Sequence, residues 1–193
     1  MDNPILALIA SFIAMSFVAS SYFVKNKSLY LIFQAFGILF LIVSYFFTVQ
    51  FFAMIGLAIG LARALIFFVY EKNDKVAPLW VAFAISFLTI ASYFIVDFWF
   101  LNNVQPYDAL CLSALVLYAF IFRIRDLKAV RFMMLAPTVL SILYNTLTQA
   151  ALFASLTYVF ELTANVVSIF RYHILENGNV AQNLTKNVKE KYE

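Results

Sequence analysis

The chain has 193 residues, of which 65% are hydrophobic and 12% are charged, and its formal net charge is +3. A soluble domain is about half apolar and a quarter charged, so this composition excludes an ordinary soluble protein. Cys111 is the only cysteine, which excludes an internal disulfide and a cysteine metal cluster. The chain also has one histidine, which excludes a multi-histidine haem or metal site, and it contains no P-loop or glycine-rich dinucleotide turn. We therefore expect no cofactor and no metal.

Hydrophobic runs fill almost the whole chain. In order they lie at about 4–24, 29–47, 50–70, 77–97, 107–122, 130–149 and 151–172. A helix needs ~20 residues to cross ~30 Å of hydrocarbon, and each run is near that length. The runs do not alternate polar and apolar residues, as strands of a membrane barrel would. The sequence predicts an all-α polytopic membrane bundle of seven transmembrane helices.

Basic residues occur in alternate gaps between these runs. The gaps after runs one, three, five and seven contain Lys25 and Lys27; Lys72 and Lys75; Arg123, Arg125, Lys128 and Arg131; and Arg171, Lys186, Lys189 and Lys191. Cationic loops stay in the cytoplasm, which predicts an outside N-terminus and a cytoplasmic C-terminus. Because the positive charge belongs to these loops, nucleic acid is not an expected partner. Arg63, inside the third run, is the single exception.

The runs divide into two groups of three joined by one. We expect a single transmembrane domain over 1–174 and a polar cytoplasmic tail over 175–193, with triplets at 4–70 and 107–172 and a linker helix at 77–97. Tyr45 and Gln50 have the same separation as Tyr144 and Gln149, which lie 99 residues later. From this 3+1+3 pseudo-repeat we predict an inverted-topology repeat about an axis in the membrane plane.

Two charges lie deep inside predicted spans. Arg63 at mid-span costs roughly 2.5–3.5 kcal/mol on insertion scales, so it should face the protein interior. Gly56 and Gly60 share its helix face and form a small-xxx-small pair that allows close helix packing. Glu161 shares a face of the seventh helix with Asn165. We predict that Arg63 and Glu161 pair directly or through water; alternatively, each meets backbone carbonyls or a separate polar neighbour.

Polar side chains on the second, third, sixth and seventh helices predict a small polar cavity near mid-membrane. The candidate solute-binding residues are Gln34, Tyr45, Arg63, Asn145, Glu161 and Asn165. The first hypothesis is facilitated transport of a small polar solute between the two triplets. The second is a non-transporting scaffold or assembly partner that acts through the 123–131 loop and the tail. An intramembrane enzyme is the third, but no set of reactive residues supports it, so catalytic activity is not expected.

The chain resembles the YgjV-type bacterial inner-membrane proteins over roughly 5–172. The resemblance rests on the segment from Gln34 to Gly37 that leads to Ser44 and Tyr45, on 60–63, and on 161–172. It implies a multi-pass protein of the bacterial cytoplasmic (inner) membrane. Independently of the resemblance, the expected partners are the lipid bilayer, a small polar solute and further copies in a homo-oligomer. The 3+1+3 order also resembles the PQ-loop, SWEET and PnuC transporter families, although the chain has no Pro-Gln dipeptide.

Overall fold

A computed structural model describes residues 4–47, 51–100, 105–148 and 152–175. These residues form seven α-helices and no strand: α1 (Pro4–Ser21), α2 (Lys27–Phe47), α3 (Phe51–Lys72), α4 (Leu79–Tyr93), α5 (Asp108–Ile121), α6 (Leu127–Thr148) and α7 (Leu152–Ile169). Two of them continue as π-helical segments, α4 into Phe94–Phe100 and α7 into Phe170–Leu175. Gln50, Gln149 and nearly all of the predicted tail lie outside the described residues.

Several of these helices have the length and composition of membrane spans. Four stretches are long and apolar enough to cross a bilayer: Lys27–Phe47, Met54–Lys72, Leu79–Val96 and Leu127–Leu147. The helices Ile5–Ser21 and Asp108–Ile121 are apolar but shorter. The all-helical membrane class is therefore confirmed, while the number of seven spans stays a prediction.

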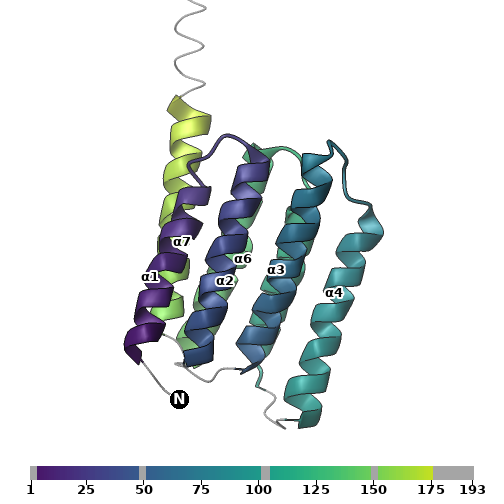
Figure 1. Ribbon diagram of the computed structural model, residues 1–193, viewed down its shortest axis with the longest axis vertical. Coiled ribbons are helices and arrows are strands. Elements are labelled where there is room, and N and C mark those ends of the chain that lie inside the picture. Colours follow the sequence, from purple (N-terminus) through teal and green to yellow (C-terminus); the bar gives the residue numbers. More distant parts are fainter. Residues whose placement is uncertain (1–3, 48–50, 101–104, 149–151, 176–193) are drawn as a thin grey trace, which may run out of the picture.

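The helices form two facing rows (Figure 1). One row contains α1, α2 and α3 in chain order, and the other contains α7, α6 and α5 behind them. The rows meet at one edge where α1 packs on α7, and α4 closes the other edge by packing on both α3 and α5. The middle helices, α2 and α6, face one another across the interior, and this is where polar side chains collect.

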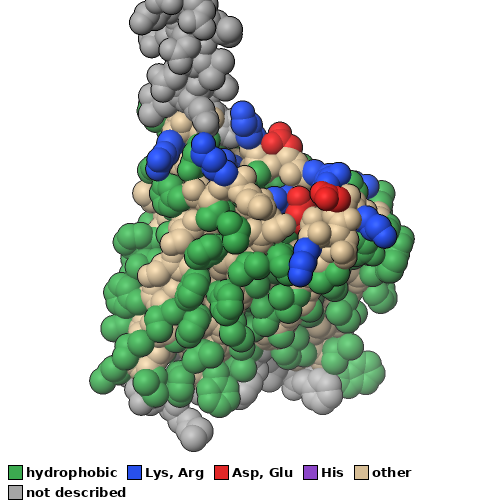
Figure 2. Space-filling view, turned by 45° about the horizontal axis from the view of Figure 1, so that its top comes forward, with side chains coloured by type: hydrophobic (Ala, Val, Ile, Leu, Met, Phe, Trp, Pro, Cys, Tyr) green, Lys and Arg blue, Asp and Glu red, His purple; other side chains and the backbone are tan. Residues whose placement is uncertain are grey.

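The charged side chains visible in Figure 2 gather at one end of the bundle. There Lys27 Nζ lies 2.9 Å from Glu71 Oε2, which joins the start of α2 to the end of α3. Arg125 Nη2 lies 3.3 Å from Asp74 Oδ1, which joins the turn after α5 to the turn after α3. We call this the charged end, and the other the opposite end.

The inverted repeat predicted from the sequence is wrong. The guanidinium of Arg131, near the start of α6, donates to the carbonyl oxygen of Val24, in the turn after α1, at 2.8 Å. The turns after α1 and α5 therefore both lie at the charged end, and the two helices run in the same direction. Two triplets that are related in this way have parallel topology, because the chain crosses the bundle an even number of times between their starts.

The turns after α1 and α5 also share their local structure. The Ser28 amide donates to Oδ1 of Asn26 at 2.8 Å, and the Lys128 amide donates to Oδ1 of Asp126 at 2.9 Å. Asn26 and Asp126 thus act as N-caps of α2 and α6, satisfying an amide that the helix leaves unpaired. These two caps lie 100 residues apart in the sequence.

Close helix packing occurs at a glycine other than the predicted pair. A Cβ atom on Gly37 would clash with Val18 Cγ2 and lie 3.3 Å from the Ala14 carbonyl oxygen, so α1 and α2 touch closely there. A Cβ on Gly56 would meet only the Leu115 side chain, at 3.3 Å, and one on Gly60 only the Arg63 guanidinium, at 3.4 Å. The Gly56–Gly60 face is therefore not a site of close backbone approach; it borders the hollow interior instead.

Candidate functional site

Two adjoining cavities lie between the rows. The first, which we call the Arg63 cavity, is lined by Val18, Gln34, Ile38, Leu41, Leu57, Gly60, Arg63, Leu115, Tyr118, Phe122, Tyr158 and Glu161. Its volume, for the centres of water-sized molecules, is about 40 Å³. A water needs at least about 10–15 Å³ on this measure, so the cavity has room for roughly three. Residues from α1, α2, α3, α5 and α7 meet here, so both rows contribute.

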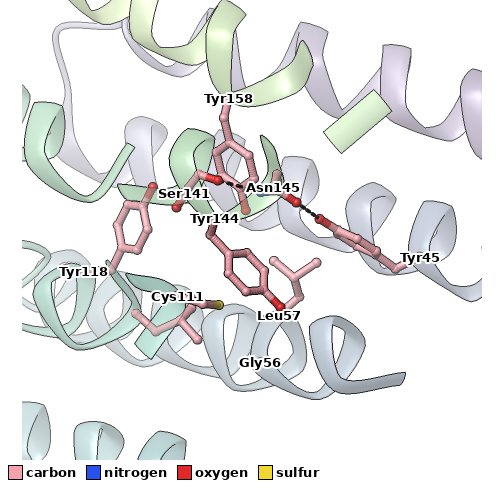
Figure 3. A pocket seen from close by; sticks show the side chains of 10 residues that line it. Tyr45, Gly56, Leu57, Cys111, Tyr118, Ser141, Tyr144, Asn145 and Tyr158 are labelled. Atoms are coloured by element: carbon pink, nitrogen blue, oxygen red, sulfur yellow. Dashed lines mark hydrogen bonds between the residues drawn. The ribbon is translucent and has the colours of Figure 1, made fainter. Parts of the chain in front are cut away.

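The second cavity, which we call the Tyr45 cavity, is shown in Figure 3. It lies nearer the opposite end, because Tyr45 stands close to the end of α2. It is lined by Tyr45, Gly56, Leu57, Cys111, Leu115, Tyr118, Ser141, Tyr144, Asn145 and Tyr158, and its volume is also about 40 Å³. Leu57, Leu115, Tyr118 and Tyr158 line both cavities. The two spaces therefore form successive parts of one hollow region along the bundle axis, and its lining is mostly apolar.

Arg63 is buried, with 4% of its surface exposed, yet it has few hydrogen-bond partners. Its Nη1 donates to the Leu115 carbonyl oxygen at 2.9 Å. Its Cζ lies 5.0 Å from the ring centre of Tyr118 and 5.1 Å from that of Phe122, in the range of cation–π contacts. Among the described residues, Nε has no hydrogen-bond partner. The guanidinium is thus oriented by two rings and one carbonyl and keeps a donor free.

Glu161 is equally buried and takes its partners from α1 and α2. Its Oε1 accepts a hydrogen bond from the Tyr22 hydroxyl at 2.7 Å. Gln34 also lies within hydrogen-bonding reach of this carboxyl group, and its Nε2 donates to Ser21 Oγ at 3.0 Å. These contacts position the carboxylate where α1, α2 and α7 meet.

Arg63 and Glu161 face the same cavity but do not form a direct ion pair. The ion pairs within the described ranges are Lys27–Glu71 and Arg125–Asp74. The arrangement matches the alternative drawn from the sequence, in which Arg63 meets a backbone carbonyl and Glu161 meets a separate polar neighbour. The direct form of the predicted pairing is therefore not observed, while a water-bridged form stays a prediction.

The remaining candidate residues fall into two groups. Tyr45 donates its hydroxyl hydrogen to Oδ1 of Asn145 at 3.1 Å, which joins α2 to α6 across the Tyr45 cavity (Figure 3). Asn145 Nδ2 in turn donates to the Ser141 carbonyl oxygen at 2.7 Å. Asn165 lines neither cavity: it is fully buried, and its Nδ2 donates to the Arg131 carbonyl oxygen at 2.8 Å. Asn165 thus joins α7 to α6 and is not placed to bind a solute.

Aromatic side chains close the interior toward the charged end. Tyr22 and Tyr30 are fully buried with ring centres 5.6 Å apart, and Phe122 lies 6.1 Å from Tyr30. Phe67 continues this aromatic layer, 6.5 Å from Phe122. Behind it, the Arg131 guanidinium lies 4.5 Å from the Tyr172 ring centre. The layer separates the Arg63 cavity from the charged loops.

The binding residues predicted from the sequence included Tyr45 but left out Tyr22, Tyr118 and Tyr158. Tyr118 and Tyr158 line both cavities, and the Tyr118 hydroxyl lies within hydrogen-bonding reach of Thr138 and Ser141. Tyr22 holds Glu161. The available signal was spacing: Tyr158 precedes Glu161 by three residues and so shares its helix face. Tyr22 and Tyr118 lie near run ends, where membrane tyrosines are common for other reasons.

The comparisons with known proteins establish the family. The model of Imp-YgjV, a bacterial inner membrane protein family, matches residues 5–176. The chain belongs to this family. No curated protein and no solved structure matches the chain. The Imp-YgjV match places the protein in the bacterial inner membrane, which agrees with its apolar helices.

Proposed function

We propose that this Imp-YgjV protein facilitates the passage of a small polar solute across the bacterial inner membrane. The observation that carries the proposal is the hollow region between the rows, in which the buried charges Arg63 and Glu161 face one cavity without pairing directly. Buried charges in membrane helices are costly, and they commonly mark substrate or ion pathways. A protein that needed only a stable bundle would gain by filling this space with apolar side chains.

The charged end is assigned to the cytoplasm and the N-terminus to the outside, following the positive-inside rule. The aromatic layer then closes the cytoplasmic side, and the Tyr45 cavity leads from the outer half toward Arg63. Solute exchange requires the two rows to move relative to one another, because each cavity holds only a few waters. The parallel triplets joined by one helix support the 3+1+3 repeat and the resemblance to SWEET-type transporters.

Flux through the purified protein tests this proposal. Proteoliposomes are loaded with labelled solutes from four classes (sugars, nucleosides, vitamins and amino acids), and their efflux is compared with that from protein-free vesicles. We expect at least one class to leave faster, and Arg63→Ala to abolish this efflux while the variant still inserts. Arg125→Ala is the matched control, because Arg125 is 48% exposed and remote from the cavities. Unchanged efflux in a well-inserted Arg63→Ala variant would refute the proposal.

The small size of both cavities favours a second candidate, a non-transporting scaffold. In that role Arg63 would fix α3 to α5 through the Leu115 carbonyl, and the exposed pair Arg125–Asp74 would belong to a cytoplasmic docking surface. This candidate predicts no efflux for any solute class. It also predicts that charge reversal in the 123–131 loop, rather than at Arg63, disrupts function in cells.

A further inference from the structure

The two charges that face the Arg63 cavity have opposite signs and different hydrogen-bond partners. Arg63 comes from α3 in one row and is held by α5, whereas Glu161 comes from α7 in the other row and is held by Tyr22 at the end of α1. Both are 4% exposed. Two opposite charges in a low-dielectric space attract strongly, so holding them apart on different partners leaves room for something between them.

Arg63, which lines that space, has one buried donor without a partner in the described part of the chain. Its Nη1 donates to the Leu115 carbonyl oxygen, and its Cζ lies over the rings of Tyr118 and Phe122, but Nε has no partner among the described residues. A buried donor left unpaired costs on the order of 1–3 kcal/mol, and more when it is charged. The edge of a guanidinium is suited to a carboxylate, which accepts from two N–H groups at once.

Glu161, by contrast, needs a cation. Oε1 accepts from Tyr22, and Gln34 is within reach, but both supply neutral donors only. A buried carboxylate is stabilised most by a cation that donates to it. Tyr158, on the same face of α7, lines the same cavity, and the faces of tyrosine rings attract an ammonium group.

We propose that the transported solute is a small zwitterion, with its carboxylate on Arg63 and its ammonium group on Glu161. This inference rests on the proposed function and names the substrate class of the same site. A simple anion would place its charge beside Glu161, and a simple cation would place its charge beside Arg63; each leaves one buried charge uncompensated. A zwitterion compensates both and adds no net charge to the membrane interior.

The dimensions limit the size of such a solute. Each cavity has room for roughly three waters, and the two adjoin through Tyr118 and Tyr158. A solute that replaced these waters would have about five to eight non-hydrogen atoms, one for each water displaced. Glycine, β-alanine and 4-aminobutyrate fall within this range, whereas a hexose or a nucleoside exceeds it.

Thermal stability of the purified full-length protein tests the inference, because a ligand of the folded state raises Tm. The probes are glycine, β-alanine and 4-aminobutyrate, each compared with the single-charge analogues acetate or butyrate and ethylammonium, and with glucose and uridine. We expect at least one zwitterion to raise Tm in a saturable manner and the single-charge analogues to bind at least tenfold more weakly. Proteoliposome efflux of the same probes should follow the same order.

Variants assign the two ends of the ligand. Arg63→Gln and Glu161→Gln should each weaken zwitterion binding at least tenfold. Thr163→Ala is the control, because Thr163 is exposed on the same helix as Glu161 and bonds only the Val159 carbonyl oxygen. If a charge variant does not fold, the wild-type comparison between zwitterions and their analogues decides alone.

The outcomes separate this inference from the function on which it rests. Equal binding of a zwitterion and its single-charge analogue overturns the zwitterion assignment. Binding and efflux of glucose or uridine, with no response to zwitterions, also overturns it and leaves facilitated transport standing. If no probe shifts Tm and no solute class shows efflux, both proposals fail together.

Discussion

Two parts of the interior are packed in different ways. Toward the charged end, Tyr22, Tyr30 and Phe122 form an aromatic layer with no more than 1% of their surfaces exposed. In the middle and toward the opposite end, the rows separate around the Arg63 and Tyr45 cavities. The dense layer supplies packing, while the hollow region contains charged and hydroxyl groups that packing would have excluded. The two levels meet at Tyr22 and Phe122, which belong to the dense layer and also contact Glu161 and Arg63.

Removing an aromatic ring from the dense layer should have the largest effect on stability. Phe122→Ala leaves a void among Tyr30, Phe67 and Tyr118, whose rings all contact it. We expect a loss on the order of 2–3 kcal/mol in the free energy of unfolding. This loss is smaller than for the same substitution in the core of a soluble protein. In a membrane protein the alternative environment of the ring is lipid rather than water, so the loss comes chiefly from the missing packing contacts. Denaturant unfolding in mixed micelles measures the loss.

Phe87→Ala is the control for that prediction, because the Phe87 side chain is 74% exposed on α4 and faces lipid. Its stability should change by only a few tenths of a kcal/mol, as for surface substitutions elsewhere. Equal losses for the two variants would mean that the charged end is no more densely packed than the rest.

Substitutions at two glycines test the same difference in packing, with a smaller expected effect on stability. Gly37→Ala places a methyl group against Val18 and the α1 backbone at Ala14, so α1 and α2 must separate. We expect destabilisation on the order of 1–2 kcal/mol, as for overpacking of a tight contact. Gly56→Ala meets only a leucine side chain at the rim of the Tyr45 cavity and should cost far less. A larger loss at Gly56, measured by the same unfolding assay, would reverse this assignment.

The sequence alone predicted the helices, the clustering of charge at one end and the burial of Arg63 and Glu161. These features follow from hydropathy and from the cost of charge in lipid, which act on each residue separately. The direct Arg63–Glu161 contact could not be predicted in this way. It depends on the rotation and depth of α3 and α7, and a difference of one residue rotates a side chain by about 100° around its helix.

Two other errors have different causes. A small-xxx-small spacing identifies a flat helix face but not the helix that covers it, so Gly56 and Gly60 were favoured over the lone Gly37. The inverted repeat was predicted because the number of membrane crossings between the two triplets was counted wrongly, not because the sequence lacked the information. Four helices, α1 to α4, precede α5, and an even number of crossings returns the chain to its starting side. The parallel orientation of the triplets could therefore have been predicted from the sequence.

The reactivity of Cys111 tests most directly whether the hollow region is an aqueous path from the outer face. Cys111 lines the Tyr45 cavity and is the only cysteine in the chain, so the native protein carries its own reporter. The silver ion Ag⁺, which is about the size of a water molecule and does not cross lipid, is added to the outer face of oriented vesicles and reacts only with a hydrated thiolate. Leu117→Cys in a Cys111→Ser background is the control, because Leu117 on α5 is exposed toward lipid. We predict that Cys111 is labelled from the outside and that the control is not. An unreactive Cys111, or labelling from the cytoplasmic face alone, would contradict the account.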